Sequence, residues 1–225
     1  MLLATIPAAG SLTFNTTFIP QFIVVRGVAG ADLTGDITGQ INVQGDGLIF
    51  NLDAAGFDAM SNIHQYLVAA SRNTIGRVFQ LATSLVTGKN TFWTFTNGDA
   101  ADVQIFGYSK VKAMKSAYYT YLTQLVLANS GADFGDFAYM TIPALAAGDN
   151  LSVLYNDGLM DANRTLRELA ADNAYYQTPD QFAIDNVAPA RVKMVTITPV
   201  ANRNIYLLRY QPVTGNVDAA LIAKA

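Results

Sequence analysis

The fold is decided by Thr94-Phe95-Thr96, followed after a six-residue connection by Val103-Gln104-Ile105-Phe106-Gly107-Tyr108. The same order returns in Thr196-Ile197-Thr198, a connection of equal length, and Ile205-Tyr206-Leu207-Leu208-Arg209-Tyr210. The offset from Thr94 to Thr196 is 102 residues, and it holds to the final tyrosine. β-Branched and aromatic residues on both sides of each connection predict two strands, so each copy is expected to be a β-hairpin.

A second matched feature lies upstream in each half of the chain. A strand ends at the turn Asp46-Gly47-Leu48 in the first half and at Asp157-Gly158-Leu159 in the second, an offset of 111 residues. A segment with helical periodicity follows each turn. Two matches in the same order, at nearly half the length of a 225-residue chain, indicate an internal duplication. Chance is the alternative, because Asp-Gly turns and Thr-x-Thr pairs are both common.

Two helices are expected, each with one apolar stripe that packs against its barrel. The first stripe consists of Phe57, Met60, His64, Leu67 and Val68. The second consists of Ala162, Leu166, Leu169 and Ala170, with Asp161 as the N-cap and Arg164 and Glu168 paired on the solvent side. The stretch Gly76–Leu85 fits either a short helix or an extended loop.

Most of the remaining chain predicts short strands between clusters of Gly, Asn and Asp. These strands are expected near Ser11–Phe18, Phe22–Arg26, Gln40–Gln44, Leu48–Leu52, Asn90–Thr96, Val103–Tyr108, Tyr121–Ala128, Phe137–Ile142, Leu151–Tyr155, Arg191–Thr198 and Ile205–Tyr210.

The duplication predicts two domains, each about the size of one antiparallel β domain. Residues 1–112 and 113–225 are expected to form one barrel each. Near this boundary Lys110, Lys112 and Lys115 interrupt the apolar pattern. We interpret them as a solvated linker, and a contact for lipid phosphate or nucleic acid is the alternative.

The composition excludes several classes of function. The chain has no cysteine, which removes thiolate catalysis and thiolate zinc sites. A net charge of −3 gives no footprint for binding naked nucleic acid. Charged residues make up only 14% of the chain, against about 25% in ordinary soluble domains. Such a surface is suited to lying against other protein, because neighbouring copies repel one another little.

Neither a membrane-spanning helix nor a signal peptide is expected. No run of about 20 apolar residues occurs in the chain. The start, Met1-Leu2-Leu3-Ala4, lacks the basic region of a signal peptide.

No catalytic, cofactor-binding or metal site is expected. His64 is the single histidine and lies on an apolar helix face, which favours a packed imidazole. The acidic segments Asp32–Asp36 and Asp133–Asp136 are the candidates for calcium, but they lack the spacing of an EF-hand and favour simple turns. Phe92, Trp93 and Phe95 form either a stacking platform or core, and strand alternation requires at least one side to be core.

Short motifs add little to this picture. The elbow Gly-x-Ser-x-Gly, the Walker loop and the Rossmann fingerprint do not occur in the sequence, so an enzyme is not expected. Glycosylation sequons begin at Asn15, Asn150 and Asn163, and that pattern is too short to assign a role without a secretory signal.

Two barrels in tandem, each with a strand, an Asp-Gly turn, a helix and a closing β-hairpin, resemble the double jelly-roll major capsid proteins. These build tailless icosahedral viruses that often enclose a membrane, including bacterial viruses of the tectivirus and corticovirus kind. The resemblance rests on Val43–Leu67, Thr94–Tyr108, Val153–Ala170 and Thr196–Tyr210. It implies an all-β fold with short helices, arranged as two tandem jelly-roll barrels.

The resemblance also implies a function. The chain is expected to be a major capsid protein that assembles as homotrimeric, pseudo-hexagonal capsomers into an icosahedral shell. Its expected partners are neighbouring capsomers, vertex and minor capsid proteins and, where the virus has one, an internal lipid membrane, without direct contact to nucleic acid. It would be made in the host cytoplasm, reside in the virion, and need no cofactor. The alternatives are a minor or vertex virion protein with a single barrel, and a carbohydrate-binding or hydrolytic β-sandwich protein.

Overall fold

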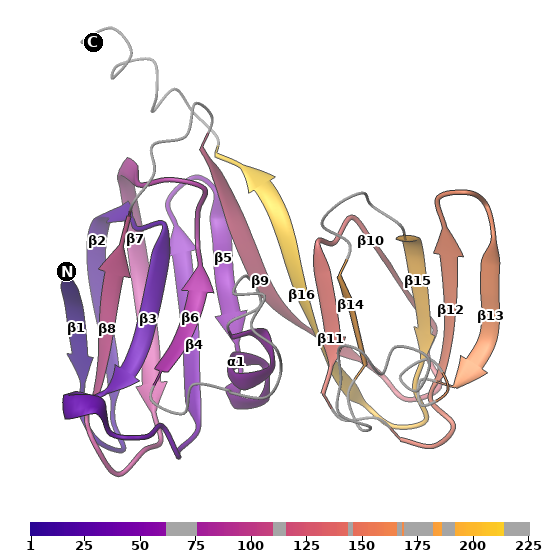
Figure 1. Cartoon of the computed structure of the whole chain (residues 1–225), viewed down its shortest axis with the longest axis horizontal. Coiled ribbons are helices and arrows are strands. Elements are labelled where there is room, and N and C mark those ends of the chain that lie inside the picture. The colour runs from indigo at the N-terminus through magenta and orange to yellow at the C-terminus, as the bar shows by residue number, and fades with distance from the viewer. Residues whose placement is uncertain are drawn as a thin grey trace, which may run out of the picture. The chain divides into compact units, whose positions relative to one another are not determined.

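A computed structural model of the chain describes residues 1–61, 76–109, 116–143, 146–165, 168, 182–185 and 192–213. The chain divides into two compact units, one formed by Met1–Leu122 with Tyr210–Ala225 and the other by Thr123–Arg209. Strands dominate both units (Figure 1).

The first eight strands lie in two sheets. In chain order they are β1 (Leu2–Ile6), β2 (Ser11–Ile19), β3 (Phe22–Gly27), β4 (Ile37–Val43), β5 (Gly47–Leu52), β6 (Gly76–Gln80), β7 (Val86–Asn97) and β8 (Val103–Tyr108). β1-β8-β3-β6 is the order of a four-stranded sheet, and β2-β7-β4-β5 are consecutive strands of an eight-stranded sheet. Neighbouring strands within each of these four-strand groups are antiparallel. A short 3-10 helix, η1 (Val28–Gly30), follows β3.

The next eight strands repeat this plan. They are β9 (Ala117–Val126), β10 (Ala132–Gly135), β11 (Tyr139–Ile142), β12 (Asn150–Tyr155), β13 (Met160–Thr165), β14 (Phe182–Asp185), β15 (Val192–Thr198) and β16 (Arg203–Pro212). Their orders are β9-β16-β11-β14 and β10-β15-β12-β13. Numbered from one to eight, both series read 1-8-3-6 and 2-7-4-5, the strand order of a jelly roll. The chain is therefore all-β with short helices and contains two tandem jelly rolls, which confirms the predicted fold class.

The predicted division between residues 112 and 113 falls in the interval between β8 and β9, and it stays a prediction. The predicted division assigns all of β9 and β16 to the second jelly roll. The compact units divide the chain differently, because the start of β9 and the end of β16 belong to the first unit. The start of β9 pairs in parallel with β5, where Phe50 lies opposite Tyr121. The chain thus leaves the first unit within β9 and returns to it within β16.

The two expected β-hairpins are wrong as hairpins. β7 pairs with β2 and β4 in one sheet, whereas β8 pairs with β1 and β3 in the other. β15 and β16 are separated between two sheets in the same way. A six-residue connection is long enough for this crossing, because facing sheets lie about 10 Å apart and an extended residue covers about 3.3 Å. The two matched segments are therefore the seventh and eighth strands of each jelly roll.

The matched Asp-Gly turns join the fourth and fifth strands in both jelly rolls. Gly47 and Gly158 have φ angles of 88° and 85°, in the left-handed region that favours glycine. A helix cap follows each fifth strand. The Asp53 carboxylate accepts a hydrogen bond from Gly56 N (2.8 Å) at the start of α1 (Ala54–Met60). The repeat therefore extends through the turn, the fifth strand and the cap.

The second predicted helix is wrong at its beginning. Met160–Thr165 is β13, and Leu151 of β12 lies opposite Arg164. Pairing with β12 outweighs the helical periodicity, since tertiary context overrides local preference. The N-cap is Thr165 rather than Asp161, because Thr165 Oγ1 accepts from Glu168 N (3.3 Å) while Thr165 N donates to Glu168 Oε2 (2.8 Å), a capping box. Other stripe residues lie outside the described residues, namely His64, Leu67, Val68, Leu166, Leu169 and Ala170.

The core of the first unit is built around packed aromatic rings. Phe50 meets Phe79 edge-on with ring centres 5.0 Å apart, and Phe57 lies 4.7 Å from Phe79. All three rings are buried. Phe57 and Met60, which the helical stripe predicts to be buried, are 2% and 0% exposed, so this part of the prediction is confirmed.

The core of the second unit is mainly aliphatic. Its buried residues are Val126, Phe134, Phe137, Met140, Ile142, Leu151, Val153, Val192, Val195, Ile197, Ile205 and Leu207. They come from β9, β10, β11, β12, β15 and β16 and, for Phe137, from the connection between β10 and β11. Both four-strand groups of this jelly roll therefore contribute to one core.

Phe57→Ala should lower the free energy of unfolding by about 3–5 kcal/mol, because it removes a ring from the centre of the aromatic core. Phe92→Ala is the matched control, since Phe92 is 48% exposed and its loss should cost less than about 1 kcal/mol. Urea unfolding of both variants at one protein concentration measures the difference. Equal losses in the two variants would contradict the position of α1 over this core.

Candidate functional site

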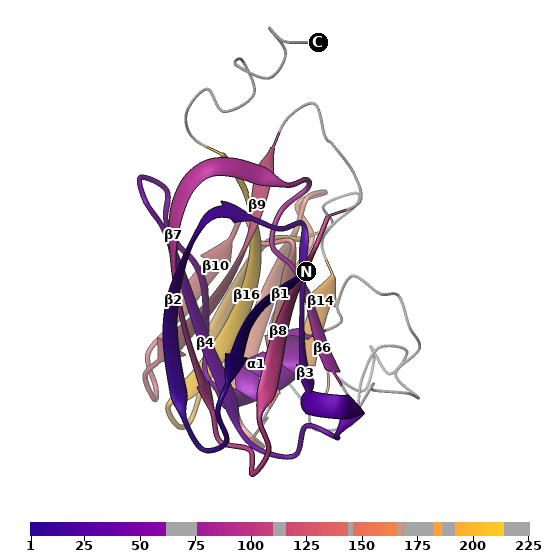
Figure 2. The ribbon, with the colours of Figure 1, turned by 90° about the vertical axis from the view of Figure 1, so that its left-hand side faces the viewer.

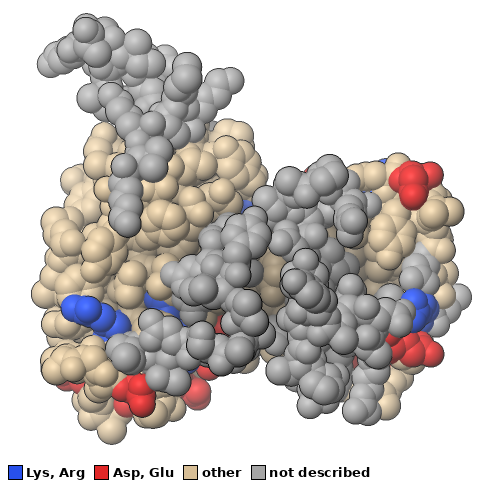
Figure 3. All heavy atoms as spheres, viewed as in Figure 1, with Lys and Arg blue, Asp and Glu red and all other residues tan. Residues whose placement is uncertain are grey.

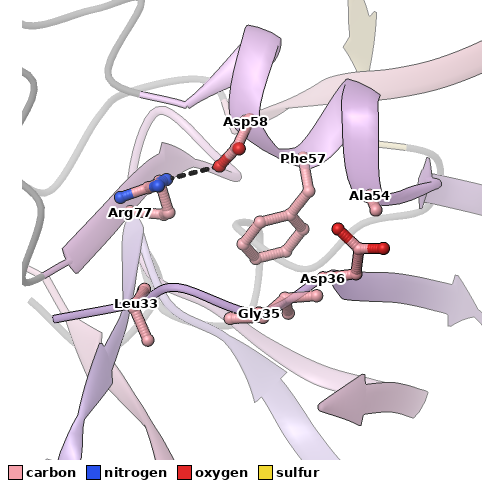
Figure 4. Close-up of a pocket in the computed structure, with 8 residues that line it drawn as sticks. Leu33, Gly35, Asp36, Ala54, Phe57, Asp58 and Arg77 are labelled. Carbon is pink, nitrogen blue, oxygen red and sulfur yellow. Dashed lines mark hydrogen bonds and ion pairs between the residues drawn. The ribbon is translucent and has the colours of Figure 1, made fainter. Parts of the chain in front are cut away.

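A small cavity lies beneath α1 and is a candidate binding site. Its lining residues are Leu33, Gly35, Asp36, Ile37, Ala54, Phe57, Asp58 and Arg77. Its volume is about 10 Å³, room for about one water molecule. The ring of Phe57 points into it, and the ion pair from Arg77 Nε to Asp58 Oδ1 (2.7 Å) lies beside it (Figure 4). A cavity of this size cannot hold an organic substrate.

The acidic segments that were candidates for calcium act as local braces. Asp36 accepts a hydrogen bond from Gly98 N (2.7 Å) through its main-chain carbonyl. Asp133 Oδ1 accepts from Thr196 Oγ1 (2.6 Å), which ties β10 to β15. Within the described residues no cluster of three or more His, Cys, Asp or Glu side chains is placed to hold a metal ion.

The aromatic cluster on β7 is divided between core and surface, as alternation along a strand predicts. Trp93 and Phe95 are fully buried, whereas Phe92 is 48% exposed. Trp93 stacks on Phe14 with ring centres 5.5 Å apart, and its Nε1 donates to Thr91 Oγ1 (2.6 Å). The packing interpretation is confirmed for two of the three rings, and a single exposed ring makes no stacking platform.

The remaining sequence candidates are the histidine, the three lysines near the predicted boundary and the sequons. His64, Lys110, Lys112 and Lys115 lie outside the described residues. Among the sequons, Asn15 is exposed on β2 and Asn150 is exposed at the start of β12. In the part of the chain that the structure describes, no helix is long and apolar enough to span a membrane.

A buried carboxylate joins two crossing connections of the first jelly roll. Asp99, in the connection from β7 to β8, accepts hydrogen bonds through Oδ2 from Thr34 N (2.7 Å) and Gly35 N (3.0 Å). Thr34 and Gly35 belong to the connection from β3 to β4. The residue is 5% exposed, and the two backbone donors hold the pKa of Asp99 below its ordinary value against the opposing effect of burial. Its main-chain carbonyl accepts from Ala9 N (2.9 Å), which adds the connection from β1 to β2.

The second jelly roll has the same arrangement with the partners exchanged. Asp149 is fully buried in the connection from β11 to β12, the counterpart of the connection that holds Thr34. It accepts from Val200 N (2.9 Å) and pairs with Arg203 Nε (2.8 Å), both next to or within the connection from β15 to β16. Pro199 O accepts from Asn129 N (2.7 Å), so the first connection is again included.

These two aspartates were not found by sequence reasoning. They occupy different connections, so the offsets of 102 and 111 residues do not align them. In the sequence, Asp99 follows the seventh strand of its half and Asp149 precedes the fourth strand of its half. Only the fold shows that, in each jelly roll, the connection before the fourth strand contacts the connection after the seventh. What the arrangement can do is hold loops in place at one end of a barrel.

A polar network holds the Asp-Gly turn of the first unit against neighbouring strands. Tyr118 Oη donates to Asp46 Oδ2 (2.9 Å), and Lys89 Nζ lies 3.1 Å from the same oxygen. Burial, and then the bond to Asp46, raises the pKa of Tyr118 far above its ordinary value, so its hydroxyl stays protonated and acts as a donor. The network joins the turn between β4 and β5 to β7 and β9.

The outer face of the sheet β2-β7-β4 is polar and uncharged. Its side chains are Ser11, Thr13, Asn15, Thr17, Thr38, Gln40, Asn42, Phe92, Thr94 and Thr96. Hydroxyl pairs such as Thr13 and Thr94 (3.2 Å) cross this face between β2 and β7. In the view of Figure 3, much of the described surface of the first unit likewise carries neither Lys, Arg, Asp nor Glu. The surface therefore offers hydrogen bonds without charge.

The chain matches no protein-family model and no curated protein sequence. Its fold is similar to that of the STIV MCP, the major capsid protein of Sulfolobus turreted icosahedral virus. The two share 11% identity with a TM-score of 0.54, over 99% of this chain and 98% of that chain. At this identity the likeness shows the fold alone.

Two further solved structures are less similar. A conserved protein of unknown function from Pseudomonas aeruginosa PAO1 shares 11% identity with a TM-score of 0.30, over 93% of this chain and 80% of that chain. A turret protein in Sulfolobus turreted icosahedral virus shares 10% identity with a TM-score of 0.20, over 95% and 98%. Scores this low carry no argument about this chain.

Asp99→Asn should lower the free energy of unfolding at pH 7 by about 1–3 kcal/mol, because a charged acceptor of two buried backbone donors is lost. The folded pKa of Asp99 is below its ordinary value of 3.8, so its stabilising effect is present above that value and is lost as pH falls through the folded pKa. Urea unfolding of both chains from pH 7 to pH 2 should show the difference shrinking only in the acid range.

Asp102→Asn is the matched control, since Asp102 is exposed and its carboxylate accepts one hydrogen bond, from Ala8 N (2.9 Å). Its effect should be smaller at every pH. A loss for Asp99→Asn that is constant with pH would rule out the ionised carboxylate as the stabilising species.

Proposed function

We propose that this chain is a major capsid protein that self-assembles into the icosahedral shell of a virus. The observation that supports this most strongly is the pair of complete jelly rolls in one chain, with the same strand order in both series. The similar fold of a known major capsid protein, over nearly the whole of both chains, adds to it.

The proposed building block is a homotrimer. Three chains with two similar barrels each would place six similar units around one axis, giving a pseudo-hexagonal capsomer that neighbours can surround. Low charge favours this use, because only 14% of residues are charged and copies repel one another little. Exposed apolar side chains are available for contacts at Leu125, Leu127, Leu159, Met160 and Tyr210.

The proposed partners follow from this role. They are neighbouring capsomers, vertex and minor capsid proteins and, where the virus has one, an internal lipid membrane. Direct contact with the genome is not part of the proposal, because the net charge is −3. The protein would be made in the host cytoplasm and reside in the virion. A bacterial host stays a prediction, since a shared fold carries no information about the host.

The alternatives have less support. A minor or vertex protein with a single barrel would require the repeat to fail, and the described strands form two complete series. A carbohydrate-binding or hydrolytic sandwich would require acids and aromatics around one groove. Among the described residues, Asp99 instead accepts backbone hydrogen bonds and Asp149 pairs with Arg203. Phe92, one of the exposed aromatic side chains, has threonines on either side in β7 at Thr91 and Thr94.

Light scattering after size-exclusion chromatography tests the building block. The purified chain should show three times the mass of one 24.1 kDa chain at micromolar concentration, with larger particles appearing as concentration or salt rises. The reason is that an obligate capsomer buries large interfaces, on the order of 2,000 Å² or more. A mass of one chain that persists as concentration rises would contradict the proposal.

A further inference from the structure

β2 is an open edge of its sheet, and it is unlike the other edges. The strand orders leave β1, β6, β10, β13, β14 and β2 at sheet ends among the described strands. Open edges of natural sheets are usually short or carry a charge or a proline, which prevents pairing between molecules. β2 is nine residues long, Ser-Leu-Thr-Phe-Asn-Thr-Thr-Phe-Ile, and has neither a charge nor a proline. Figure 2 shows it along the margin of the first unit, beside β7.

The remaining edges are protected in the usual way. β6 contains Arg77, β10 contains Asp133, β13 contains Arg164 and β14 contains Asp185, and none exceeds six residues. β1 has five residues and a register shift after Leu2. The equivalent strand of the second jelly roll is β10, which has four residues and an acid. The lack of protection is therefore particular to β2, not to its place in the fold.

The register shows which backbone groups of β2 are directed outward. Asn97 N donates to Gly10 O (2.8 Å), and the pairing continues from Ser11 opposite Thr96 to Thr16 opposite Thr91. Residues in an antiparallel pair alternate between bonding to the neighbour and facing away. Alternate residues from Gly10 onward bond to β7, so the N–H and C=O groups of Ser11, Thr13 and Asn15 face away from it.

We propose that β2 pairs antiparallel with β2 of a second copy of this chain, with Thr13 on the two-fold axis. Ser11 would lie opposite Asn15 of the partner subunit, so the outward-facing groups of both strands meet in register. The regular stretch is long enough, because the register shift of β2 begins only after Thr16. This contact deepens the proposed function and rests on it for its setting, the junction between two capsomers.

The chemistry of this face fits a copy of itself better than other partners. A two-fold contact places Thr13 against its own copy and Ser11 against Asn15 of the partner subunit, which is acceptable for these uncharged side chains, whereas a charge on the axis would meet a like charge. The outer face has no Lys or Arg for nucleic acid or anionic lipid and only one exposed ring, Phe92. An isologous contact also closes after two copies, so an unprotected edge of this kind does not produce fibres.

A single introduced thiol tests the contact, because the chain has no cysteine of its own. Thr13→Cys should give a covalent dimer of two 24.1 kDa chains on a non-reducing gel after mild oxidation of assembled protein. Opposed Cβ atoms in an antiparallel pair lie about 4.5–5.5 Å apart, close to disulfide range. Asn42→Cys is the matched control, exposed on the same face but on β4, and it should give no dimer.

Thr13→Lys provides a second measurement on an uncrosslinked chain. Two lysines opposed on the axis should reduce particle yield by about tenfold or more while leaving the capsomer mass unchanged. Asn42→Lys should leave the yield unchanged. Equal cross-linking from Thr13→Cys and Asn42→Cys, or an unchanged yield for Thr13→Lys, would overturn the pairing.

The outcomes separate this contact from the proposed function. Particles formed without cross-linking at Thr13 would overturn the pairing and leave the capsid role standing. Cross-linking at Thr13 in a chain that forms neither trimers nor particles would support the pairing and overturn the capsid role.

Discussion

A buried carboxylate holds the crossing connections together at one end of each jelly roll. The strands on both sides of these connections keep their places in the two facing sheets only while the connections are held. In a jelly roll the seventh strand lies in one sheet and the eighth in the other, so the chain between them must cross an end of the core. Asp99 fixes that crossing by accepting Thr34 N and Gly35 N, and Asp149 does so by accepting Val200 N and pairing with Arg203. Each carboxylate is buried, so its oxygens would lack hydrogen-bond partners, at a cost in free energy, if these donors moved away.

The repeat could be predicted from sequence because the same strand-forming residues and Asp-Gly turns occur in the same order in both halves. The offset between Thr94 and Thr196 located the seventh and eighth strands of both jelly rolls, and the Asp-Gly turns located the fourth and fifth. The pairing of these strands could not be predicted, since alternation along β7 and β8 is the same whether they form a hairpin or face one another across a core. β13 was missed because Ala162 fits the apolar stripe of a helix, and the hydrogen bonds between Thr165 and Glu168 place the N-cap at Thr165 rather than at Asp161.

The two jelly rolls share a topology but differ in what they present to their surroundings. The first has an aromatic core and a long, uncharged edge at β2, whereas the second has a largely aliphatic core and the short, acidic edge β10. A duplicated barrel whose copies differ in this way can make distinct contacts at places that are geometrically equivalent. Asp99 and Asp149 were missed because they lie in different connections of the two jelly rolls, so the sequence repeat does not align them.

Electron cryomicroscopy of particles assembled from the purified chain tests the central claim most directly. The account predicts a shell of capsomers with three-fold symmetry, each showing six jelly-roll barrels around its axis, two from every chain. Thr94–Tyr108 and Thr196–Tyr210 should occupy equivalent strands of neighbouring barrels in the reconstruction. A preparation that yields only separate, folded chains under all conditions of concentration and salt would contradict a capsid role, and a shell with three barrels around that axis would contradict the double jelly roll.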